Sequence, residues 1–267
     1  MPRVSPWLAP IALLTLVPLL VVLSSFLQPQ PDVWAHLARY VLPGVLANTA
    51  LLIGGVGAGV LLLGASLAWL TAACDFPGRR FFSWALVLPL AMPAYVLAFV
   101  LVGLFDYSGP LQSALRLIAG DSVWFPPVRS RAGALITLTL AFYPYVYLLA
   151  REAFLSQGRR ALEAAQTLGL TRTQALWRVA LPMARPWLAG GVTLALMESL
   201  ADFGAVSIFN FDTFTTAIYK AWFSLFSLPA AAQLASLLVL FVLLATQGLQ
   251  PTKQLLYSCK RVAPRSA

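Results

Sequence analysis

Glu198 and Asp202 are the residues best suited to chemistry, because both are acidic and both lie within an otherwise apolar stretch, 187–209. They are four positions apart, so a continuous helix would place them on one face. A charge at the centre of a bilayer costs about 2.5 to 3.5 kcal/mol on insertion scales, so such a pair requires a polar cavity or a partner. A second possibility is that Asp202 lies near the membrane surface and only Glu198 is deep, paired with an arginine or a backbone group.

A polar and aromatic stretch, 210–216, follows these carboxylates and supplies two further candidates for a pathway, Asn210 and Asp212. We expect an external hairpin or a short amphipathic helix here. Tyr219 and Trp222 would then anchor it at the membrane surface. Alternatively, the stretch forms an outer gate or a docking surface.

The composition determines which kind of fold must position these residues. The chain has 267 residues, of which 60% are hydrophobic and 10% charged, whereas a soluble domain has about 25% charged residues. We therefore predict an all-α integral membrane protein with about six transmembrane helices. The first run lacks a cleavage site, so we expect it to be retained. The predicted spans are 8–26, 48–73, 82–105, 132–150, 187–209 and 230–249.

The basic residues predict the orientation of these spans. If both termini are cytoplasmic, thirteen of the eighteen Lys and Arg residues face the cytoplasm, as the positive-inside rule requires. The segment 151–185 is then also cytoplasmic. The net charge of +9 does not indicate nucleic-acid binding, because the basic residues do not gather with aromatic residues on a soluble face.

Several kinds of site are not expected. Two cysteines and one histidine leave no Cys/His metal constellation, and no G-x-x-x-x-G-K-[ST] loop is present to hold ATP. We therefore expect no metal site, no bound cofactor and no ATP hydrolysis by this chain. Gly55 and Gly59 could suggest a dinucleotide fingerprint, but no strand precedes them, so we predict close helix packing instead.

Two further groups of residues lie within the predicted spans. Pro89 and Pro93 free backbone carbonyls, which predicts either a simple kink or direct contact with a ligand. Tyr143, Tyr145 and Tyr147 lie towards the end of their span, which is typical of interfacial anchors.

The charged segment between the fourth and fifth spans has a distinct local pattern over 163–182. Gly169 suits the left-handed position that ends a helix. Thr171 and Gln174 form a capping box that begins a second helix, and Pro182 is expected to end that helix by Leu181. The pattern predicts a helix, a sharp turn and a second helix, with an apolar surface that another protein could grip.

This segment resembles the EAA loop of binding-protein-dependent ABC importer permeases. The matching residues are Glu163, Ala164, Ala165, Gly169, Leu181 and Pro182, with Val179 where the pattern prefers Ile. The resemblance implies a type I ABC importer permease bundle in the bacterial inner membrane, with this loop in a groove of a separate ATPase. It also implies an extracytoplasmic solute-binding protein and a second permease half. The alternative is an ordinary basic cytoplasmic loop.

Residues 198–205, 213–216 and 91–95 resemble the branch of this family that moves ferric iron, with thiamine and phosphonate relatives close by. Ferric iron is therefore the expected cargo, and thiamine or a phosphonate the alternative. With one loop and no internal repeat, either two copies pair or the chain is half of a longer or split permease. We divide it into 1–44, the permease core 45–250, and a basic tail or linker 251–267.

Two other classes of function differ in what they require of the carboxylates. In a secondary transporter driven by protons or sodium, Glu198 and Asp202 would be the coupling carboxylates, but the inverted repeat typical of many such folds is missing. A non-transporting assembly or insertion factor would not require carboxylates within the membrane.

Overall fold

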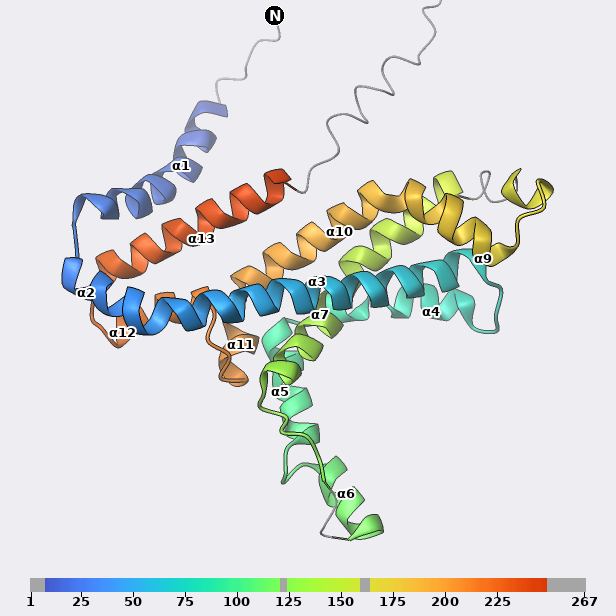
Figure 1. Cartoon of the computed structure of the whole chain (residues 1–267), viewed down its shortest axis with the longest axis horizontal. Coiled ribbons are helices and arrows are strands. Elements are labelled where there is room, and N and C mark those ends of the chain that lie inside the picture. Colours follow the sequence, from blue (N-terminus) through green and yellow to red (C-terminus); the bar gives the residue numbers. More distant parts are fainter. Residues whose placement is uncertain (1–7, 121–123, 159–163, 249–267) are drawn as a thin grey trace, which may run out of the picture. The chain divides into compact units, whose positions relative to one another are not determined.

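The computed structural model describes residues 8–120, 124–158 and 164–248, and within these ranges every regular element is a helix (Figure 1). The predicted all-α class is thus confirmed. The first elements are α1 (Leu8–Ser24), η1 (Ser25–Leu27), α2 (Pro31–His36), η2 (Leu37–Val41), α3 (Leu42–Ala73), α4 (Arg79–Ala85), η3 (Leu88–Ala91), α5 (Ala94–Phe105) and α6 (Pro110–Ala119). They are followed by α7 (Arg131–Ala153), η4 (Phe154–Gly158), α9 (Arg172–Ala175), η5 (Leu176–Ala180), α10 (Leu181–Ala201), α11 (Gly204–Ile208), α12 (Phe214–Phe223) and α13 (Leu228–Gly248).

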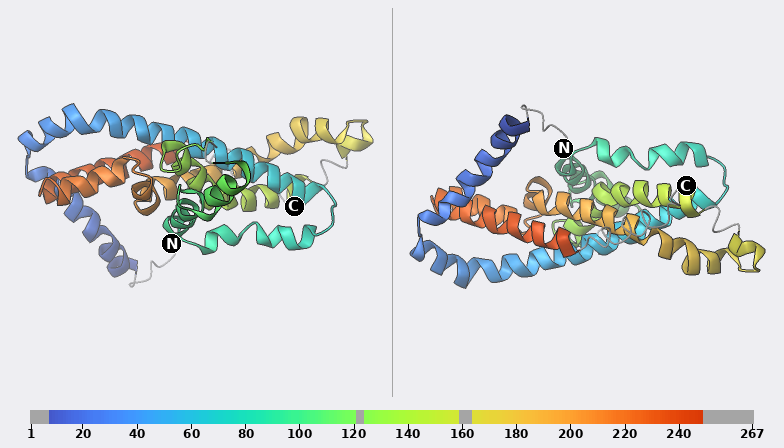
Figure 2. Two further views of the ribbon diagram at one scale, coloured as in Figure 1. Left: turned by 90° about the horizontal axis from the view of Figure 1, so that it is seen from below. Right: turned by 90° about the horizontal axis from the view of Figure 1, so that it is seen from above.

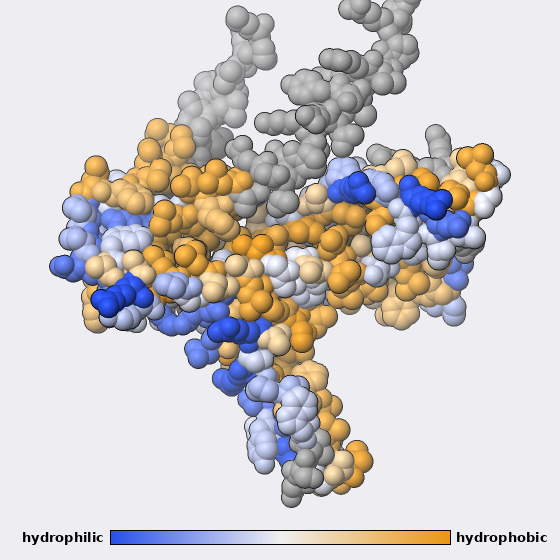
Figure 3. All heavy atoms as spheres, viewed as in Figure 1, coloured by the Kyte–Doolittle hydropathy of each residue, from blue (hydrophilic) through white to orange (hydrophobic). Residues whose placement is uncertain are grey.

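The helices provide enough apolar length to cross a membrane several times. Four stretches of the described chain are long and apolar enough to do so, namely Pro31–Ala73, Ala94–Ala119, Arg131–Ser156 and Thr173–Ala201. Leu16–Leu27 and Leu228–Leu244 are shorter apolar helices. Each of the six predicted spans overlaps one of these stretches. In Figure 3 apolar residues cover much of the middle of the visible surface, whereas hydrophilic residues gather over the end that carries α9.

Contacts within the chain divide it into two units. The first contains the described residues of Met1–Thr49 and Asp212–Leu243, and the second those of Ala50–Phe211 and Leu244–Ala267. The division of the chain into 1–44, 45–250 and 251–267 stays a prediction.

The first unit is built around α13 and the helices at the start of the chain. Its core contains Leu37, Ala230 and Leu234, which are buried together. The buried side chain of Gln233 accepts a hydrogen bond from Trp34 Nε1 and donates to the carbonyl of Ser25 at 2.8 Å. In the same unit, the stretch after Asp212 forms the short helix expected there, α12.

The second unit is built around α7, which contacts α3 and α10 at positions where small residues permit close approach. A Cβ atom added to Gly64 of α3 would lie 2.7 Å from Val146 Cβ of α7. A Cβ atom added to Gly55 would lie 2.8 Å from Leu135 Cδ1 of α7, and one added to Gly59 would lie 2.5 Å from Thr139 Oγ1. The predicted packing role of Gly55 and Gly59 is therefore confirmed.

The prolines of the third predicted span break it rather than merely bend it. Helix α4 ends at Ala85, η3 follows, and Met92 adopts an extended backbone (φ −110°, ψ 132°) before α5 begins. Pro93 directly precedes the first residue of α5. The broken segment contributes to the candidate site, as described below.

The tyrosines of α7 contact this broken segment. Tyr143 Oη donates to the carbonyl of Leu86 at 2.9 Å, and Tyr147 Oη donates to the carbonyl of Ser83, also at 2.9 Å. Both tyrosines are buried. The prediction that they are interfacial anchors is therefore wrong. They supply donors to a stretch of backbone that no regular helix satisfies.

The fifth predicted span is also interrupted. Helix α10 ends at Ala201, Asp202 is extended (ψ 128°), and the short helix α11 begins at Gly204. A Cβ atom on Gly204 would lie 2.6 Å from Tyr95 Cβ, so α11 approaches α5 very closely. The expectation that Glu198 and Asp202 share one helix face is wrong, because only Glu198 belongs to the helix.

Candidate functional site

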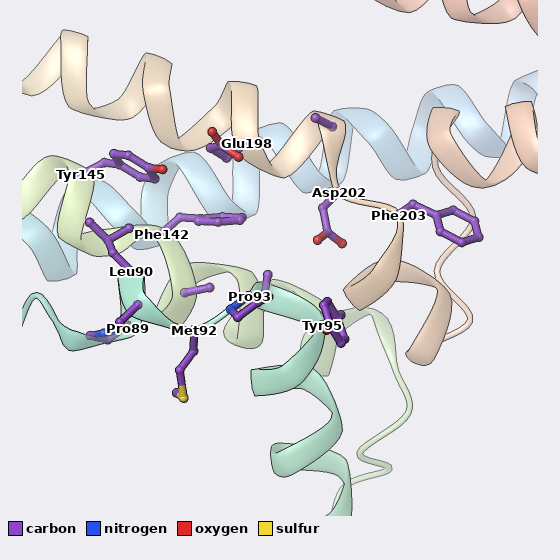
Figure 4. A pocket seen from close by; sticks show the side chains of 14 residues that line it. Pro89, Leu90, Met92, Pro93, Tyr95, Phe142, Tyr145, Glu198, Asp202 and Phe203 are labelled. Carbon is purple, nitrogen blue, oxygen red and sulfur yellow. The ribbon is translucent and has the colours of Figure 1, made fainter.

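A cavity of about 450 Å³ lies in the second unit, where the end of α10 meets α7 and the broken segment before α5 (Figure 4). Its wall combines the non-helical backbone at Met92 and Pro93 with side chains from three helices. The lining residues are Pro89, Leu90, Ala91, Met92, Pro93, Ala94, Tyr95, Ala141, Phe142, Tyr145, Glu198, Ala201, Asp202 and Phe203. The two prolines thus both break the helix and line the cavity.

Both predicted carboxylates face this cavity. Glu198 lies in the last turn of α10 and is exposed, whereas Asp202 follows the helix and is half-buried. Asp202 Oδ1 accepts hydrogen bonds from the backbone amides of Ala205 at 2.8 Å and Val206 at 3.2 Å. These bonds explain why the chain leaves the helix here, since an aspartate side chain readily caps the next helix.

The cavity wall is acidic in character. Among the described residues that line it, Glu198 and Asp202 are the charged ones, and none is Lys, Arg or His. Polar atoms are added by the hydroxyl groups of Tyr95 and Tyr145. The arrangement therefore favours a positively charged or hydrogen-bonding ligand.

Tyr145 was not predicted as a site residue. It lies between Tyr143 and Tyr147 in sequence, but those two side chains are buried against the broken segment while Tyr145 lines the cavity. Figure 4 shows its hydroxyl end directed towards Glu198. The signal that could have identified it is the helical spacing. Tyr145 is two residues from both Tyr143 and Tyr147, which places it about 160° around the helix axis from each of them.

Asn210 and Asp212 have local structural roles. Asn210 is the left-handed residue that ends α11 (φ 53°), after which the amide of Phe211 donates to the carbonyl of Val206 at 2.9 Å. Asp212 belongs to the first unit, where Lys220 Nζ donates to both its carboxylate oxygens at 2.7 Å. Neither residue lines the cavity. That they contact a substrate stays a prediction.

The segment that carries the EAA pattern has the predicted turn. Residues 164–167 are helical, and Gly169 is left-handed (φ 85°). The amide of Gly169 donates to the carbonyl of Gln166 at 3.0 Å, and that of Leu170 to the carbonyl of Ala165 at 3.1 Å. This pair of bonds is the Schellman motif that a C-terminal glycine makes possible. Glu163 lies outside the described residues.

The predicted capping box is also present. The amide of Gln174 donates to Thr171 Oγ1 at 3.4 Å, and the amide of Thr171 donates to Gln174 Oε1 at 3.1 Å. The prediction that the second helix ends by Leu181 is wrong. The helix continues through a π-helical turn, η5, in which the Leu181 amide donates to the Leu176 carbonyl, five residues earlier.

The π-helical turn explains how Pro182 is tolerated. In a regular α-helix the ring of Pro182 would meet the carbonyl four residues before it. A wider turn directly before the proline changes this spacing, and Pro182 then lies at the second position of α10. Segment 164–182 is thus connected to α10 without a break.

The side chains of segment 164–182 divide into an inward and an outward set. Ala165, Ala175 and Ala180 are buried, and Val179, Leu181 and Pro182 are half-buried. By contrast, Leu168 is 84% exposed and Trp177 is 68% exposed. Two views in Figure 2 show α9 beyond the end of α7. Trp177 was not predicted, although an exposed tryptophan in a basic segment indicates a contact surface.

Three kinds of comparison place the chain among known proteins. A family model described as "Binding-protein-dependent transport system inner membrane component" matches residues 61–250. A ferric iron transport system permease protein of Haemophilus influenzae is 30% identical over 76% of this chain, but the alignment covers 36% of that longer protein. A sulfate transport system permease of Salmonella typhimurium (29% identical) and a molybdenum transport system permease of H. influenzae (28%) are covered over 71% and 77% of their lengths.

Solved structures show the same fold at lower identity. A bacterial ABC transporter involved in the import of the acidic polysaccharide alginate has a TM-score of 0.70 at 20% identity, over 92% of this chain and 94% of that chain. An amino acid ABC transporter with histidines has a TM-score of 0.58 at 16% identity, over 84% and 97% of the two chains. The predicted permease fold is confirmed.

Proposed function

Because the chain belongs to the family of binding-protein-dependent transport system inner membrane components, we propose that it is the permease subunit of an ATP-driven importer of ferric iron. It is a multi-pass membrane protein with several apolar helices. We assign both termini to the cytoplasmic side of a bacterial inner membrane, consistent with the positive-inside rule.

The segment 164–182 is the proposed contact with a separate ATPase. It extends beyond α7, exposes Leu168 and Trp177, and is joined to α10 by η5. Together with Glu163 it contains the EAA pattern: Ala164, Ala165, Gly169, Val179, Leu181 and Pro182. ATP would be bound and hydrolysed by that partner. A second permease half and an extracytoplasmic solute-binding protein complete the proposed assembly. Another solved structure with a similar fold, with a TM-score of 0.65 at 18% identity, is a bacterial alginate ABC transporter in complex with a periplasmic protein.

The choice of ferric iron as the cargo rests on the acidic cavity. Glu198 and Asp202 line it, and no basic residue does so within the described chain. Two unit charges 4 Å apart interact by about 4 kcal/mol at an effective dielectric constant of 20. A sulfate or molybdate ion would therefore be repelled by these carboxylates, while a ferric species would be attracted.

The relatives leave a second candidate for the cargo. Sulfate and molybdenum permeases match over a larger share of their lengths than the ferric iron permease does. An oxyanion is thus the specific rival. Thiamine, a phosphonate and ion-coupled transport remain the alternatives that the sequence suggested.

The test uses cells in which the chromosomal gene for this chain is deleted and a copy is supplied on a plasmid. It measures their uptake of labelled ferric iron, sulfate and molybdate. We expect the wild type to restore ferric iron uptake. Glu198→Gln and Asp202→Asn should each lower it by about tenfold or more, because each removes one attractive charge. Glu152→Gln is the matched control, since Glu152 is exposed at the end of α7 and does not line the cavity.

Restoration of sulfate or molybdate uptake instead would reassign the cargo while keeping the permease function. Equal loss in Glu152→Gln and Glu198→Gln would show that the effect does not depend on the cavity. Uptake by vesicles that contain a proton gradient and no ATP would contradict the importer and favour an ion-coupled transporter.

A further inference from the structure

A second polar cavity lies in the second unit, between the end of α3, the start of α4 and the end of α7. Its volume is about 510 Å³. It is lined by Asp75, Phe76, Gly78, Arg79, Arg80, Ser83 and Arg151. We propose that this cavity binds the phosphate group of an anionic phospholipid.

One of its three arginines already has partners. Arg79 Nε donates to the carbonyl of Thr71 at 2.7 Å and Nη2 to that of Ala72 at 2.9 Å, which caps the end of α3. Its Nη1 pairs with the carboxylate of Asp75. Arg79 and Asp75 therefore offset one another, and Arg80 and Arg151 provide the positive charge of the cavity.

Arg151 provides the more specific indication of a ligand. Its side chain is half-buried, and its Nε atom is buried without a hydrogen-bond partner in the part of the chain that the structure describes. A buried donor of a charged group is costly when it has no acceptor. A phosphate group has several acceptor oxygens, and guanidinium groups bind it through two parallel hydrogen bonds. The hydroxyl of Ser83, on the same wall, already donates to the carbonyl of Arg80 at 2.8 Å, so the arginines would supply the donors to the phosphate.

The surroundings indicate that the phosphate belongs to a lipid. Helix α4 begins at Arg79 and exposes three aromatic side chains next to the cavity: Phe81 (55% exposed), Phe82 (46%) and Trp84 (55%). Exposed aromatic residues of this kind are typical of the membrane interface, at the depth of the headgroups. Basic pockets between membrane helices on the cytoplasmic side bind anionic headgroups. Acyl chains beside Phe81 and Trp84 would bury these rings while the phosphate contacts Arg80 and Arg151.

The proposal depends on the position of the chain in a membrane and not on its cargo. A cavity that binds no lipid would leave the assignment to ferric iron import unchanged. Conversely, the lipid site would remain if the cargo were an oxyanion.

The test titrates the purified full-length chain in a neutral detergent with phosphatidylglycerol or phosphatidylcholine of equal chain length and counts bound lipids by native mass spectrometry. We expect phosphatidylglycerol to bind about tenfold more tightly. Arg80→Gln and Arg151→Gln should each lower that affinity by about tenfold, the effect of losing one charge-assisted hydrogen bond. Binding of phosphatidylcholine should change little.

Arg185→Gln is the matched control, because Arg185 is exposed in the first turns of α10 and does not line the cavity. Because Arg80 is exposed, Arg80→Gln should fold as the wild type does, so a loss of lipid binding in this variant would not result from misfolding. Equal affinity for the two lipids, or an equal loss in Arg185→Gln, would overturn the proposal. Displacement of phosphatidylglycerol by millimolar inorganic phosphate would show a site for free phosphate and would likewise overturn the lipid assignment.

Discussion

A Cβ atom on Gly191 would lie 2.7 Å from Val146 Cα, so α10 contacts the backbone of α7 directly at this point. The neighbouring Gly190 differs, because a Cβ atom there would meet only Leu149 Cδ1 at 3.8 Å, an ordinary contact. We predict that Gly191→Ala forces the helices apart and lowers the unfolding free energy by about 1 to 3 kcal/mol. Gly190→Ala should be neutral or stabilising, because alanine favours a helix. Thermal unfolding in detergent would compare them, and equal melting temperatures would contradict the close contact.

The conformation of Gly169 should decide whether the segment 164–182 binds the proposed ATPase. A Cβ atom added to Gly169 would have no neighbour within 4 Å in the described chain, so a side chain fits, but φ is 85°. Gly169→Val should cost about 1 to 2 kcal/mol in the turn, because a left-handed backbone is unfavourable for L-residues. Gly169→Asn should behave nearly as the wild type, since asparagine tolerates this conformation. Co-purification with the ATPase is the measurement. Retention of the ATPase by Gly169→Val would show that the turn is not needed.

The hydrogen bond from Tyr147 to Ser83 should stabilise the broken segment before α5. Tyr147→Phe keeps the ring and leaves the Ser83 carbonyl without this donor, so we expect a loss of about 1 to 3 kcal/mol in unfolding free energy. Tyr145→Phe is the control, because Tyr145 faces the cavity and makes no such bond to Ser83 or Leu86. Thermal melts of the two variants should therefore differ. A smaller effect for Tyr147→Phe than for Tyr145→Phe would contradict this assignment.

Two substitutions separate the structural role of Asp202 from its charge. Asp202→Ala removes the acceptor for the amides of Ala205 and Val206, which should lower stability by about 0.5 to 2 kcal/mol. Asp202→Asn keeps an acceptor oxygen at the same place and should remain close to the wild type in its melting temperature, while ferric iron uptake falls. If Asp202→Asn melts as low as Asp202→Ala, the carboxylate charge itself holds α11 in place.

The parts of the structure that could be predicted are those determined by neighbouring residues. The turn at Gly169 and the box formed by Thr171 and Gln174 require partners no more than five positions away, so their residue types suffice. The six apolar runs and the pairing of Gly55 and Gly59 with another helix likewise follow from composition and spacing.

The parts that could not be predicted depend on distant partners. Tyr147 resembles an interfacial anchor until its acceptor, the Ser83 carbonyl, 64 positions earlier, is known. Asp202 resembles a member of a continuous helix, because nothing nearby in the sequence shows that its side chain caps α11 instead. The predicted helix end before Pro182 is wrong for a different reason. The π-helical turn η5 precedes the proline, and the helix continues through it.

Helix α10 joins two regions that have been described separately. It is one helix of 21 residues from Leu181 to Ala201, about 30 Å long at 1.5 Å per residue, with η5 at one end and Asp202 at the other. The proposed ATPase contact and the acidic wall of the cavity are therefore ends of a single helical element, and a displacement of the Leu181 end would have this continuous backbone as its direct route to Glu198.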